Sequence, residues 1–254
     1  MHRVRLVAFD LDDTLAPSKS AIPPDMARAL RDLLEVVDVC VISGGQWLQF
    51  ETQVIAHLDA DQSQAARLHI MPTCGTRYLR LGADGWQSVY EHLLPDDVRA
   101  RVKDLLGVQA RSLGLWEEDA WGEVIEDRGS QITFSALGQE APLEAKRAWD
   151  PSGEKRITLA RALAPHLPDL EVRAGGSTSV DITPAGVDKA YGMRALAEQT
   201  GIALEEMVFV GDRLDPDGND YPVKALGVRC IETTGPEMTV EVIDRLIEEI
   251  GEDT

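Results

Sequence analysis

Cysteine and basic residues are both scarce in this chain of 254 residues. Its three cysteines, Cys40, Cys74 and Cys230, lie far apart and form no CxxC pair. That spacing argues against a disulfide framework or a zinc ribbon, and it is typical of reduced thiols in a cytoplasmic protein. Only 25 Lys and Arg accompany 44 Asp and Glu, so the formal net charge is −19. We therefore expect no nucleic-acid partner and no binding to anionic membrane surfaces.

Long apolar runs are missing as well. No run in the sequence approaches the roughly 20 residues that a membrane-spanning helix requires, and we expect no membrane segment. The length is sufficient for one large domain or two unequal ones. A monomer and a homodimer both remain open at this stage.

The most informative segment is Asp10-Leu11-Asp12-Asp13-Thr14, which follows the apolar run Arg5–Phe9. A short apolar run that ends in turn residues predicts a buried parallel strand, and open α/β sheets bind ligands at the carboxyl ends of such strands. Two carboxylates this close repel each other unless they share a proton or a cation. Asp10 and Asp12 are therefore candidates for holding Mg²⁺ and attacking phosphorus. A turn stabilised by local hydrogen bonds is the alternative.

Three further polar segments follow predicted strands or begin a predicted helix. Ser43-Gly44-Gly45 combines a hydroxyl with backbone N–H groups, which can hold an anion at a helix N-terminus. Lys189 begins a helix, where its charge can neutralise a nucleophile and a phosphate. The loop 211–220 has four carboxylates and an amide, a set of oxygens that suits a hard cation. A tight turn, a surface lysine or a solvated acidic loop would explain each one alone, but their joint occurrence predicts an active site.

The order of predicted elements indicates an α/β fold: a doubly wound, mostly parallel core sheet with an inserted α+β cap domain. Predicted strands at 5–9, 36–42 and 68–71 alternate with helices, and this alternation resumes with a strand at 207–210. Between these regions, a hairpin over 78–89 and short antiparallel-type strands interrupt the alternation. We place the core at residues 1–84 and 185–254, and the cap at residues 85–184.

Asp10-x-Asp12-x-Thr14, Ser43, Lys189 and Gly211-Asp212 with Asn219-Asp220 resemble the haloacid dehalogenase-like (HAD) superfamily of phosphohydrolases and phosphomutases. The inserted segment is similar to the branch with a large α+β cap, which includes Cof-type sugar phosphatases and eukaryote-type phosphomannomutases. The resemblance implies a Rossmann-like core, Asp10 as nucleophile and Asp12 as general acid/base. It also implies Mg²⁺ held by Asp10, Asp12, Asp212 and Asp220, and phosphate held by Thr14, Ser43, Gly44, Lys189 and Asn219.

The segments Arg128–Phe134 and Gly175–Asp181 look like parts of the phosphomannomutase cap. This likeness implies substrate contacts from five cap residues: Arg128, Lys146, Arg147, Ser179 and Asp181. The chain departs from the family pattern at Asp13, where glycine is usual, and we expect this carboxylate to face solvent or accept a backbone hydrogen bond. The run Ser135–Pro142 also lacks the arginines with which phosphomannomutases hold a second phosphate, and Lys146 and Arg147 are candidate replacements.

These features predict a Mg²⁺-dependent phosphatase that hydrolyses a small phosphorylated metabolite, with a sugar phosphate as the favoured class, through a phospho-aspartate intermediate. The alternative is a phosphomannomutase-like hexose phosphomutase, disfavoured by the missing arginines. A third hypothesis is a phospho-acceptor module like a response-regulator receiver, which also uses clustered aspartates, a hydroxyl and a lysine. That fold is shorter and has no cap. The sequence leaves the identity of the substrate open.

Overall fold

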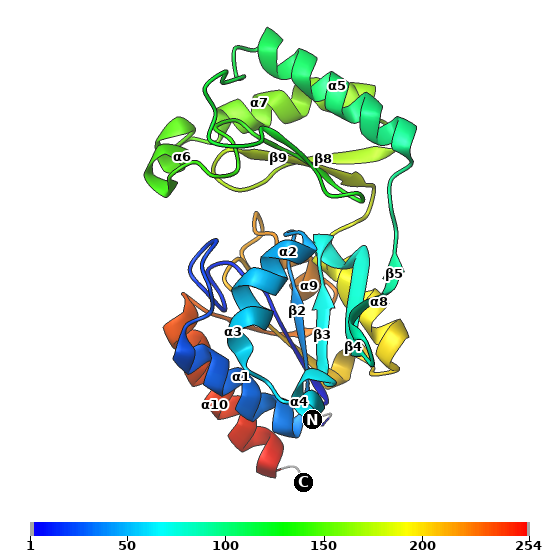
Figure 1. The fold of residues 1–254 in the computed structure, drawn as a ribbon, viewed down its shortest axis with the longest axis vertical. Coiled ribbons are helices and arrows are strands. Elements are labelled where there is room, and N and C mark those ends of the chain that lie inside the picture. The colour runs from blue at the N-terminus through cyan, green and yellow to red at the C-terminus, as the bar shows by residue number, and fades with distance from the viewer. Residues whose placement is uncertain (1–2, 253–254) are drawn as a thin grey trace. The chain divides into compact units, whose positions relative to one another are not determined.

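The chain folds into two compact units in the computed structural model, which describes residues 3–252 (Figure 1). Unit 1 joins Met1–Glu91 to Asp188–Thr254, and unit 2 is His92–Val187. The first boundary therefore follows Glu91 rather than residue 84. The reason is that β5 (Gly85–Glu91) pairs antiparallel with β4 (Arg77–Gly82) and extends the sheet of unit 1. The second boundary follows Val187 rather than residue 184.

Unit 1 is built on a seven-stranded sheet within residues 3–252, in the order β11-β10-β1-β2-β3-β4-β5. The first five strands in this order run parallel to one another. Strand β4 is antiparallel to β3, and β5 is antiparallel to β4. The parallel strands are β1 (Leu6–Phe9), β2 (Asp38–Ile42), β3 (Leu68–Met71), β10 (Met207–Gly211) and β11 (Arg229–Glu232). The predicted α/β class with a mostly parallel, doubly wound core is thus confirmed.

Helices cover both faces of this sheet (Figure 1). Alternate strand residues point to opposite faces, so Val7 and Phe9 pack in the cluster that contains α1 and α10, while Leu6 and Ala8 pack in the cluster that contains α8 and α9. These helices are α1 (Pro24–Val36), α10 (Pro236–Glu252), α8 (Lys189–Thr200) and α9 (Tyr221–Ala225). The predicted strand at 36–42 began too early, because Val36 is the last residue of α1.

Shorter helical segments connect the strands of unit 1. Between β2 and β3 the chain forms α2 (Trp47–Phe50), a π-helical turn (Glu51–Ile55), α3 (Ala56–Leu58) and α4 (Gln62–Ala65). Two 3₁₀ turns, Thr73–Gly75 and Leu204–Glu206, lie after β3 and before β10. The first of these turns adjoins the candidate site described below.

Unit 2 is an antiparallel sheet with helices, as predicted for the α+β insert. Its strands, in the order β6-β7-β9-β8, are β6 (Ile125–Asp127), β7 (Ile132–Ser135), β9 (Ser179–Pro184) and β8 (Leu170–Ala174). Its helices are α5 (Asp96–Ser112), α6 (Leu143–Trp149) and α7 (Glu154–Leu163), followed by a 3₁₀ turn at Ala164–His166. Ile132, Phe134 and Val180 share a buried apolar cluster with residues of α5 and α7. The alternate residues of β7 and β9 are polar and form a separate face.

A cluster of polar side chains around the buried His69 lies near the amino ends of β2 and β3, at the opposite end of these strands from their carboxyl ends. His69 is fully buried, and its Nδ1 lies 2.8 Å from the Tyr78 hydroxyl and 3.2 Å from an Arg80 guanidinium nitrogen. Its Nε2 lies 3.5 Å from a carboxylate oxygen of Asp38. Because Arg80 can only donate, Nδ1 accepts and the proton sits on Nε2, facing Asp38. The surroundings of His69 therefore favour the neutral ring.

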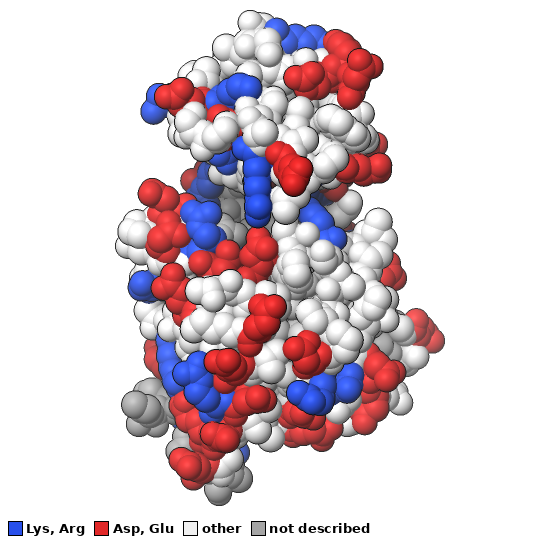
Figure 2. All heavy atoms as spheres, turned by 90° about the vertical axis from the view of Figure 1, so that its left-hand side faces the viewer, with Lys and Arg blue, Asp and Glu red and all other residues white. Residues whose placement is uncertain are grey.

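The surface reflects the acidic composition. Acidic side chains spread over much of the face in Figure 2, with Lys and Arg in small groups between them. Among residues 3–252, every helix is either too short or too polar to span a bilayer.

Candidate active site

Asp10, Ser43 and Asp212 each follow one of three neighbouring parallel strands. The register places Phe9 opposite Val41 of β2 and Val210 of β10, so all three strands end at the same edge of the sheet. This edge is formed by carboxyl ends, where open α/β sheets bind their ligands. The prediction that these distant segments converge is thereby supported in the folded chain.

Three carboxylates gather at this edge. Asp10, Asp212 and Asp220 each offer an oxygen atom within 4.8 Å of the others. Asp10 and Asp220 are buried, and Asp212 is half-buried. The ammonium of Lys189, which is only 1% exposed, lies 2.6 Å from Asp10 Oδ1 and 2.5 Å from Asp220 Oδ1. A single buried lysine thus contacts two of the three carboxylates.

Burial and mutual repulsion shift the protonation of this cluster. Burial raises the pKa of Asp10 to about 7; Lys189 opposes this rise and the charge of Asp220 adds to it. Burial also raises the pKa of Asp212, again with a contribution from Asp220. For Lys189, burial alone would lower the pKa, but the charges of Asp10 and Asp220 outweigh it and raise the pKa. The cluster thus holds one firmly protonated ammonium and carboxyl groups that a further cation would stabilise as carboxylates.

The donor set fits Mg²⁺. When ionised, three carboxylates and one ammonium carry a combined charge of −2, which one divalent ion would neutralise. Hard cations prefer carboxylate oxygens, and Mg²⁺ is commonly bound by one or two carboxylates plus substrate phosphate. Asp220 Oδ2 also accepts a hydrogen bond from the backbone N–H of Arg213 at 3.1 Å. Both oxygens of Asp220 therefore have protein partners, which suits a residue that orients Lys189. Each carboxylate oxygen has a second lone pair, so these contacts leave room for a metal ion.

The segment after β1 folds so that its polar residues have different partners. Asp12 accepts hydrogen bonds from the backbone N–H of Lys19 and from the Gln49 side-chain amide, both at 2.8 Å. Thr14, predicted to hold phosphate, is buried and donates its hydroxyl to Asp212 across 3.3 Å. Asp13 is exposed and has a φ of 60°, and its carboxylate accepts from the Ser18 N–H at 3.1 Å. Glycine is usual in such a left-handed position, and aspartate is among the few other residues that adopt it readily.

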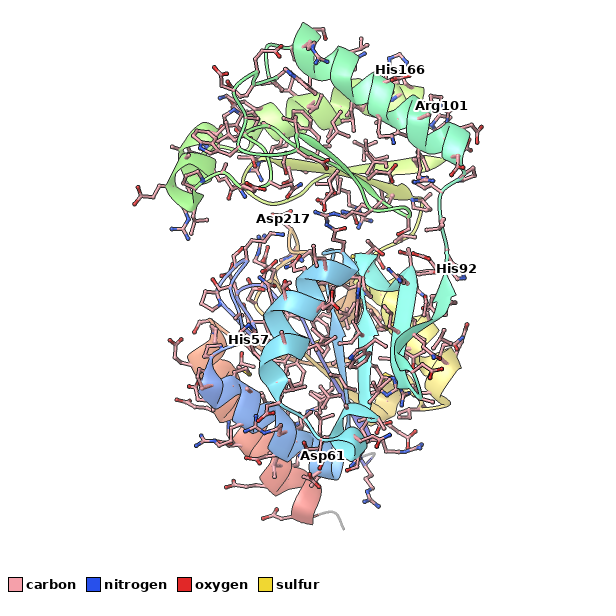
Figure 3. All side chains as sticks on the ribbon, in the orientation of Figure 1. His57, Asp61, His92, Arg101, His166 and Asp217 are labelled. Atoms are coloured by element: carbon pink, nitrogen blue, oxygen red, sulfur yellow. The ribbon has the colours of Figure 1, made fainter. Side chains whose placement is uncertain are left out.

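The second phosphate-binding segment is a compact loop. Ser43 is buried, and its hydroxyl oxygen accepts from the N–H of Gly45 at 3.2 Å. Gly44 is half-buried beside it. Asn219 differs from the other predicted phosphate ligands because it is exposed on the loop 212–220, as is Asp217, which is labelled in Figure 3.

Gln49 is a site residue that the sequence did not reveal. Its side-chain nitrogen donates to Asp12 Oδ2 and also, at 3.0 Å, to Gln53 Oε1. A Cβ at position 45 would collide with the Gln49 side-chain oxygen, so Gly45 is needed for this arrangement. In the sequence, the only sign of the pairing between Gly45 and Gln49 is a glycine followed by a polar residue one helical turn later.

The five predicted cap residues differ in their contacts. Arg128 pairs with Glu126 at 2.6 Å. Asp181 accepts from Gln131 at 2.9 Å and from Thr133 at 2.7 Å, across the β7–β9 ladder. These contacts place Asp181 in the polar face of the sheet of unit 2.

Of the remaining three cap residues, Ser179 and Lys146 make hydrogen bonds within unit 2, and Arg147 is exposed. Ser179 lies 3.2 Å from the Ser135 hydroxyl, which accepts from Gln139 at 3.1 Å. Lys146 donates to the Gln139 carbonyl at 2.8 Å. Arg147 is exposed on α6. A chain of contacts thus connects Lys146 with Ser179, but Arg147 does not take part in it.

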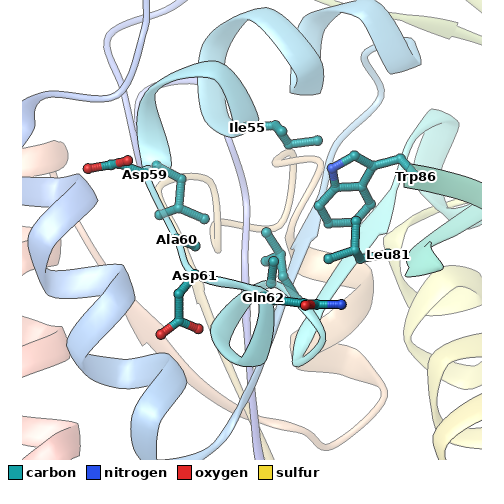
Figure 4. Close-up of a pocket in the computed structure, with 10 residues that line it drawn as sticks. Ile55, Asp59, Ala60, Asp61, Gln62, Leu81 and Trp86 are labelled. Carbon is teal, nitrogen blue, oxygen red and sulfur yellow. The ribbon is translucent and has the colours of Figure 1, made fainter. Parts of the chain in front are cut away.

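A separate pocket of about 240 Å³ lies in unit 1 (Figure 4). It is lined mostly by apolar side chains, among them Ile55, Leu81 and Trp86. None of its lining residues is one of the predicted site residues. The acidic cluster at the strand ends, and not this pocket, therefore remains the candidate site.

Comparisons with known proteins identify the family of this chain. A family model described as eukaryotic phosphomannomutase matches residues 26–249. A phosphomannomutase from Dendrobium officinale is 25% identical over 86% of this chain and 84% of its own length. A phosphomannomutase from Encephalitozoon cuniculi is 24% identical over 96% of this chain and 93% of its own.

A solved structure shares the fold over nearly the whole chain. A haloacid dehalogenase-like hydrolase from Bacteroides thetaiotaomicron superimposes with a TM-score of 0.65 and 18% identity, covering 96% of this chain and 100% of that one. At this level of identity the likeness concerns the fold.

Proposed function

This chain belongs to the eukaryotic phosphomannomutase family of the HAD superfamily, and from this premise we propose that it is a Mg²⁺-dependent hexose phosphomutase with Asp10 as nucleophile. The observation that carries the proposal is the position of Lys189 between the carboxylates of Asp10 and Asp220, with Asp212 in the same cluster. The family comparisons support a mutase better than the phosphatase that the sequence favoured.

The reaction follows from the contacts at the strand ends. A carboxylate oxygen of Asp10 attacks the phosphorus of the sugar phosphate, forming an acyl phosphate as the bond to the sugar oxygen breaks. Asp12, two residues further on, donates a proton to that departing oxygen. It then takes a proton from the sugar hydroxyl that attacks the acyl phosphate and accepts the phosphoryl group from Asp10. Lys189 holds Asp10 in place and offsets negative charge on the phosphoryl oxygens.

Three groups would prepare the site for this step. Mg²⁺, held by Asp10, Asp212, the Asp12 carbonyl and Asp220, would offset the negative charge that builds on the phosphoryl group. Ser43 and the backbone N–H of Gly44 would orient the phosphoryl oxygens. Gln49 and the Lys19 N–H fix the carboxylate of Asp12, so that its proton is delivered from a defined position.

In unit 2, the polar face of the sheet is the part that would recognise the sugar. Asp181, Thr133 and Gln131 form a hydrogen-bonded set that suits hydroxyl groups. Arg173 lies directly across the β8–β9 ladder from Asp181. Together with the predicted cations Arg128 and Lys146, it is a candidate for holding the second phosphate.

A second candidate function is hydrolysis, and one observation favours it. The run Ser135–Pro142 contains no arginine or lysine, and Arg128 is paired with Glu126. A phosphatase needs to hold one phosphate, whereas a mutase must hold two in alternation. The cap residues thus agree less well with the mutase than the core residues do.

Incubation with mannose 1-phosphate, Mg²⁺ and a hexose 1,6-bisphosphate activator distinguishes the two functions. We expect mannose 6-phosphate to appear without stoichiometric inorganic phosphate. Release of inorganic phosphate with no isomer would contradict the mutase and favour the phosphatase. If a panel of sugar phosphates gave neither product, both functions would be wrong.

A further inference from the structure

The short turn after β3 has an unusual backbone. Thr73, Cys74 and Gly75 all have positive φ angles, of 48°, 55° and 84°. Two of these residues are not glycine, and a β-branched residue such as Thr73 is a marked outlier in this region. Strained backbone persists only where surrounding contacts hold it, and it concentrates at functional sites. The contacts of this turn therefore indicate what the strain maintains.

On one side, the turn holds the loop Ser43–Gly45. The N–H of Cys74 donates to the Ser43 carbonyl and the N–H of Thr73 donates to the Gly45 carbonyl, each at 2.9 Å. In a trans peptide the carbonyl and the next N–H point in opposite directions. Fixing the Ser43 carbonyl against the turn therefore directs the N–H of Gly44 away from the turn.

On the other side, the turn is in backbone contact with α8, the helix that begins at Lys189. A Cβ on Gly75 would lie 2.6 Å from Gly192 Cα, and a Cβ on Gly192 would lie 2.7 Å from the Cys74 carbonyl oxygen. Gly192 is three residues after Lys189, nearly one helical turn. The distance between the turn and α8 thus helps to set how far Lys189 reaches toward Asp10.

A hydrogen bond from β5 completes the support. The Tyr90 hydroxyl donates to the Gly75 carbonyl at 2.8 Å. Tyr90 is next to the last residue of β5, and unit 2 begins directly after that strand. The turn is therefore supported from the strand that leads out of unit 1.

We propose that the turn Thr73–Gly75 is a positioning element of the phosphate site, because it fixes the Ser43–Gly45 loop on one side and the helix of Lys189 on the other. Its residues act through these two groups and do not themselves react. The inference rests on the proposed function, since it concerns the same phosphate site.

A matched pair of variants at one position tests this role. Cys74→Asn introduces a residue that readily adopts left-handed backbone, whereas Cys74→Val introduces a β-branched residue that resists it. We expect Cys74→Val to lower kcat/KM at least about tenfold, as small displacements of catalytic groups do, and to weaken Mg²⁺-dependent binding of orthovanadate by a similar factor. Cys74→Asn should restore both values to within about threefold of wild type.

Gly192→Ala gives an independent test from the helix side. It should weaken turnover and orthovanadate binding in the same way as Cys74→Val. Its methyl group would lie 2.7 Å from the Cys74 carbonyl oxygen and closer still to the flexible end of Ile42, so α8 would have to move away from the turn. Gly201→Ala is the control: Gly201 caps the end of α8 with a φ of 68°, and no atom lies within 4 Å of a Cβ placed there. This control should lower the urea midpoint without changing orthovanadate affinity.

The outcomes separate this proposal from the proposed function. If Cys74→Val and Gly192→Ala bind orthovanadate as wild type does, or if Gly201→Ala weakens binding equally, the positioning role is wrong while the enzyme's activity stands. If wild type neither turns over a sugar phosphate nor binds orthovanadate with Mg²⁺, the proposed function is wrong, and this inference fails with it.

Discussion

Lys189 and Asp10 form a buried ion pair in which the ammonium nitrogen lies 2.6 Å from a carboxylate oxygen. The two side chains are 1% and 6% exposed, and the same ammonium also contacts Asp220. One ammonium cannot neutralise two buried carboxylates, so the cluster has an excess of negative charge. This imbalance is the physical basis for binding a divalent cation and an electrophilic phosphorus at the strand ends.

Replacing Lys189 with Met should cost both stability and activity. Removing one partner of a buried ion pair leaves uncompensated charge and typically costs about 3–5 kcal/mol of unfolding free energy. Urea denaturation measures this loss, and we expect turnover to become undetectable. The double variant Lys189→Met/Asp220→Asn should recover part of the stability but no activity. Arg194→Met, an exposed position on the same helix, is the control and should leave both properties near wild type.

The apparent affinity for Mg²⁺ should increase as the pH rises through about 7. Burial raises the pKa of Asp10 to about 7 and also raises that of Asp212. Below this range the carboxyl groups bind protons that Mg²⁺ must displace, whereas above it they are already ionised. Calorimetric titrations at several pH values measure the trend. An affinity that stays constant or falls from pH 6 to about 8 would contradict this assignment.

Asp13 should be dispensable for catalysis. Its φ of 60° is accessible to glycine, and its carboxylate accepts only a surface backbone hydrogen bond from Ser18 among the described contacts of that side chain. Asp13→Gly should therefore keep kcat within about twofold and change stability by no more than about 0.5 kcal/mol. Asp13→Val should destabilise by about 1–2 kcal/mol, because a β-branched residue resists left-handed backbone. If Asp13→Gly instead lost Mg²⁺ binding, a role in a cation site would follow.

The order of strands and the converging motifs could be predicted because they depend on local patterns. The apolar run before Asp10 and the turn residues after it define a strand and its end. The same logic located Asp212, and the change of pattern after the strand at 68–71 revealed the insert. These signals are carried by short segments, and the parallel register brings them together.

Other features could not be predicted because they depend on contacts between distant residues. Tyr78–Val89 indicated a hairpin, but nothing local showed that β5 pairs into the sheet of unit 1. The burial of Thr14 and the contact between Gln49 and Asp12 arise from packing. The approach of Gly75 to Gly192 likewise joins segments that share no pattern.

His69 should make the stability of the fold depend on pH near neutrality. Burial lowers its pKa below the ordinary value of 6.5, so below pH 6.5 the unfolded chain binds a proton that the folded chain resists. Stability is therefore retained above this pH and lost as the pH falls. Urea midpoints at about pH 7.5 and about pH 5.5 should differ more for wild type than for His69→Asn. The control His57→Gln, at an exposed position, should keep the wild-type difference.

The measurement that tests the nucleophile most directly is trapping the phosphoenzyme. Wild type is mixed with a radiolabelled sugar bisphosphate and Mg²⁺, quenched in acid within one turnover and digested. The account predicts label on the peptide that contains Asp10, labile to hydroxylamine as an acyl phosphate. It predicts no label and at least about a thousandfold loss of turnover for Asp10→Asn, with an unchanged circular dichroism spectrum. Turnover by wild type without label, or label and turnover retained in Asp10→Asn, would contradict it.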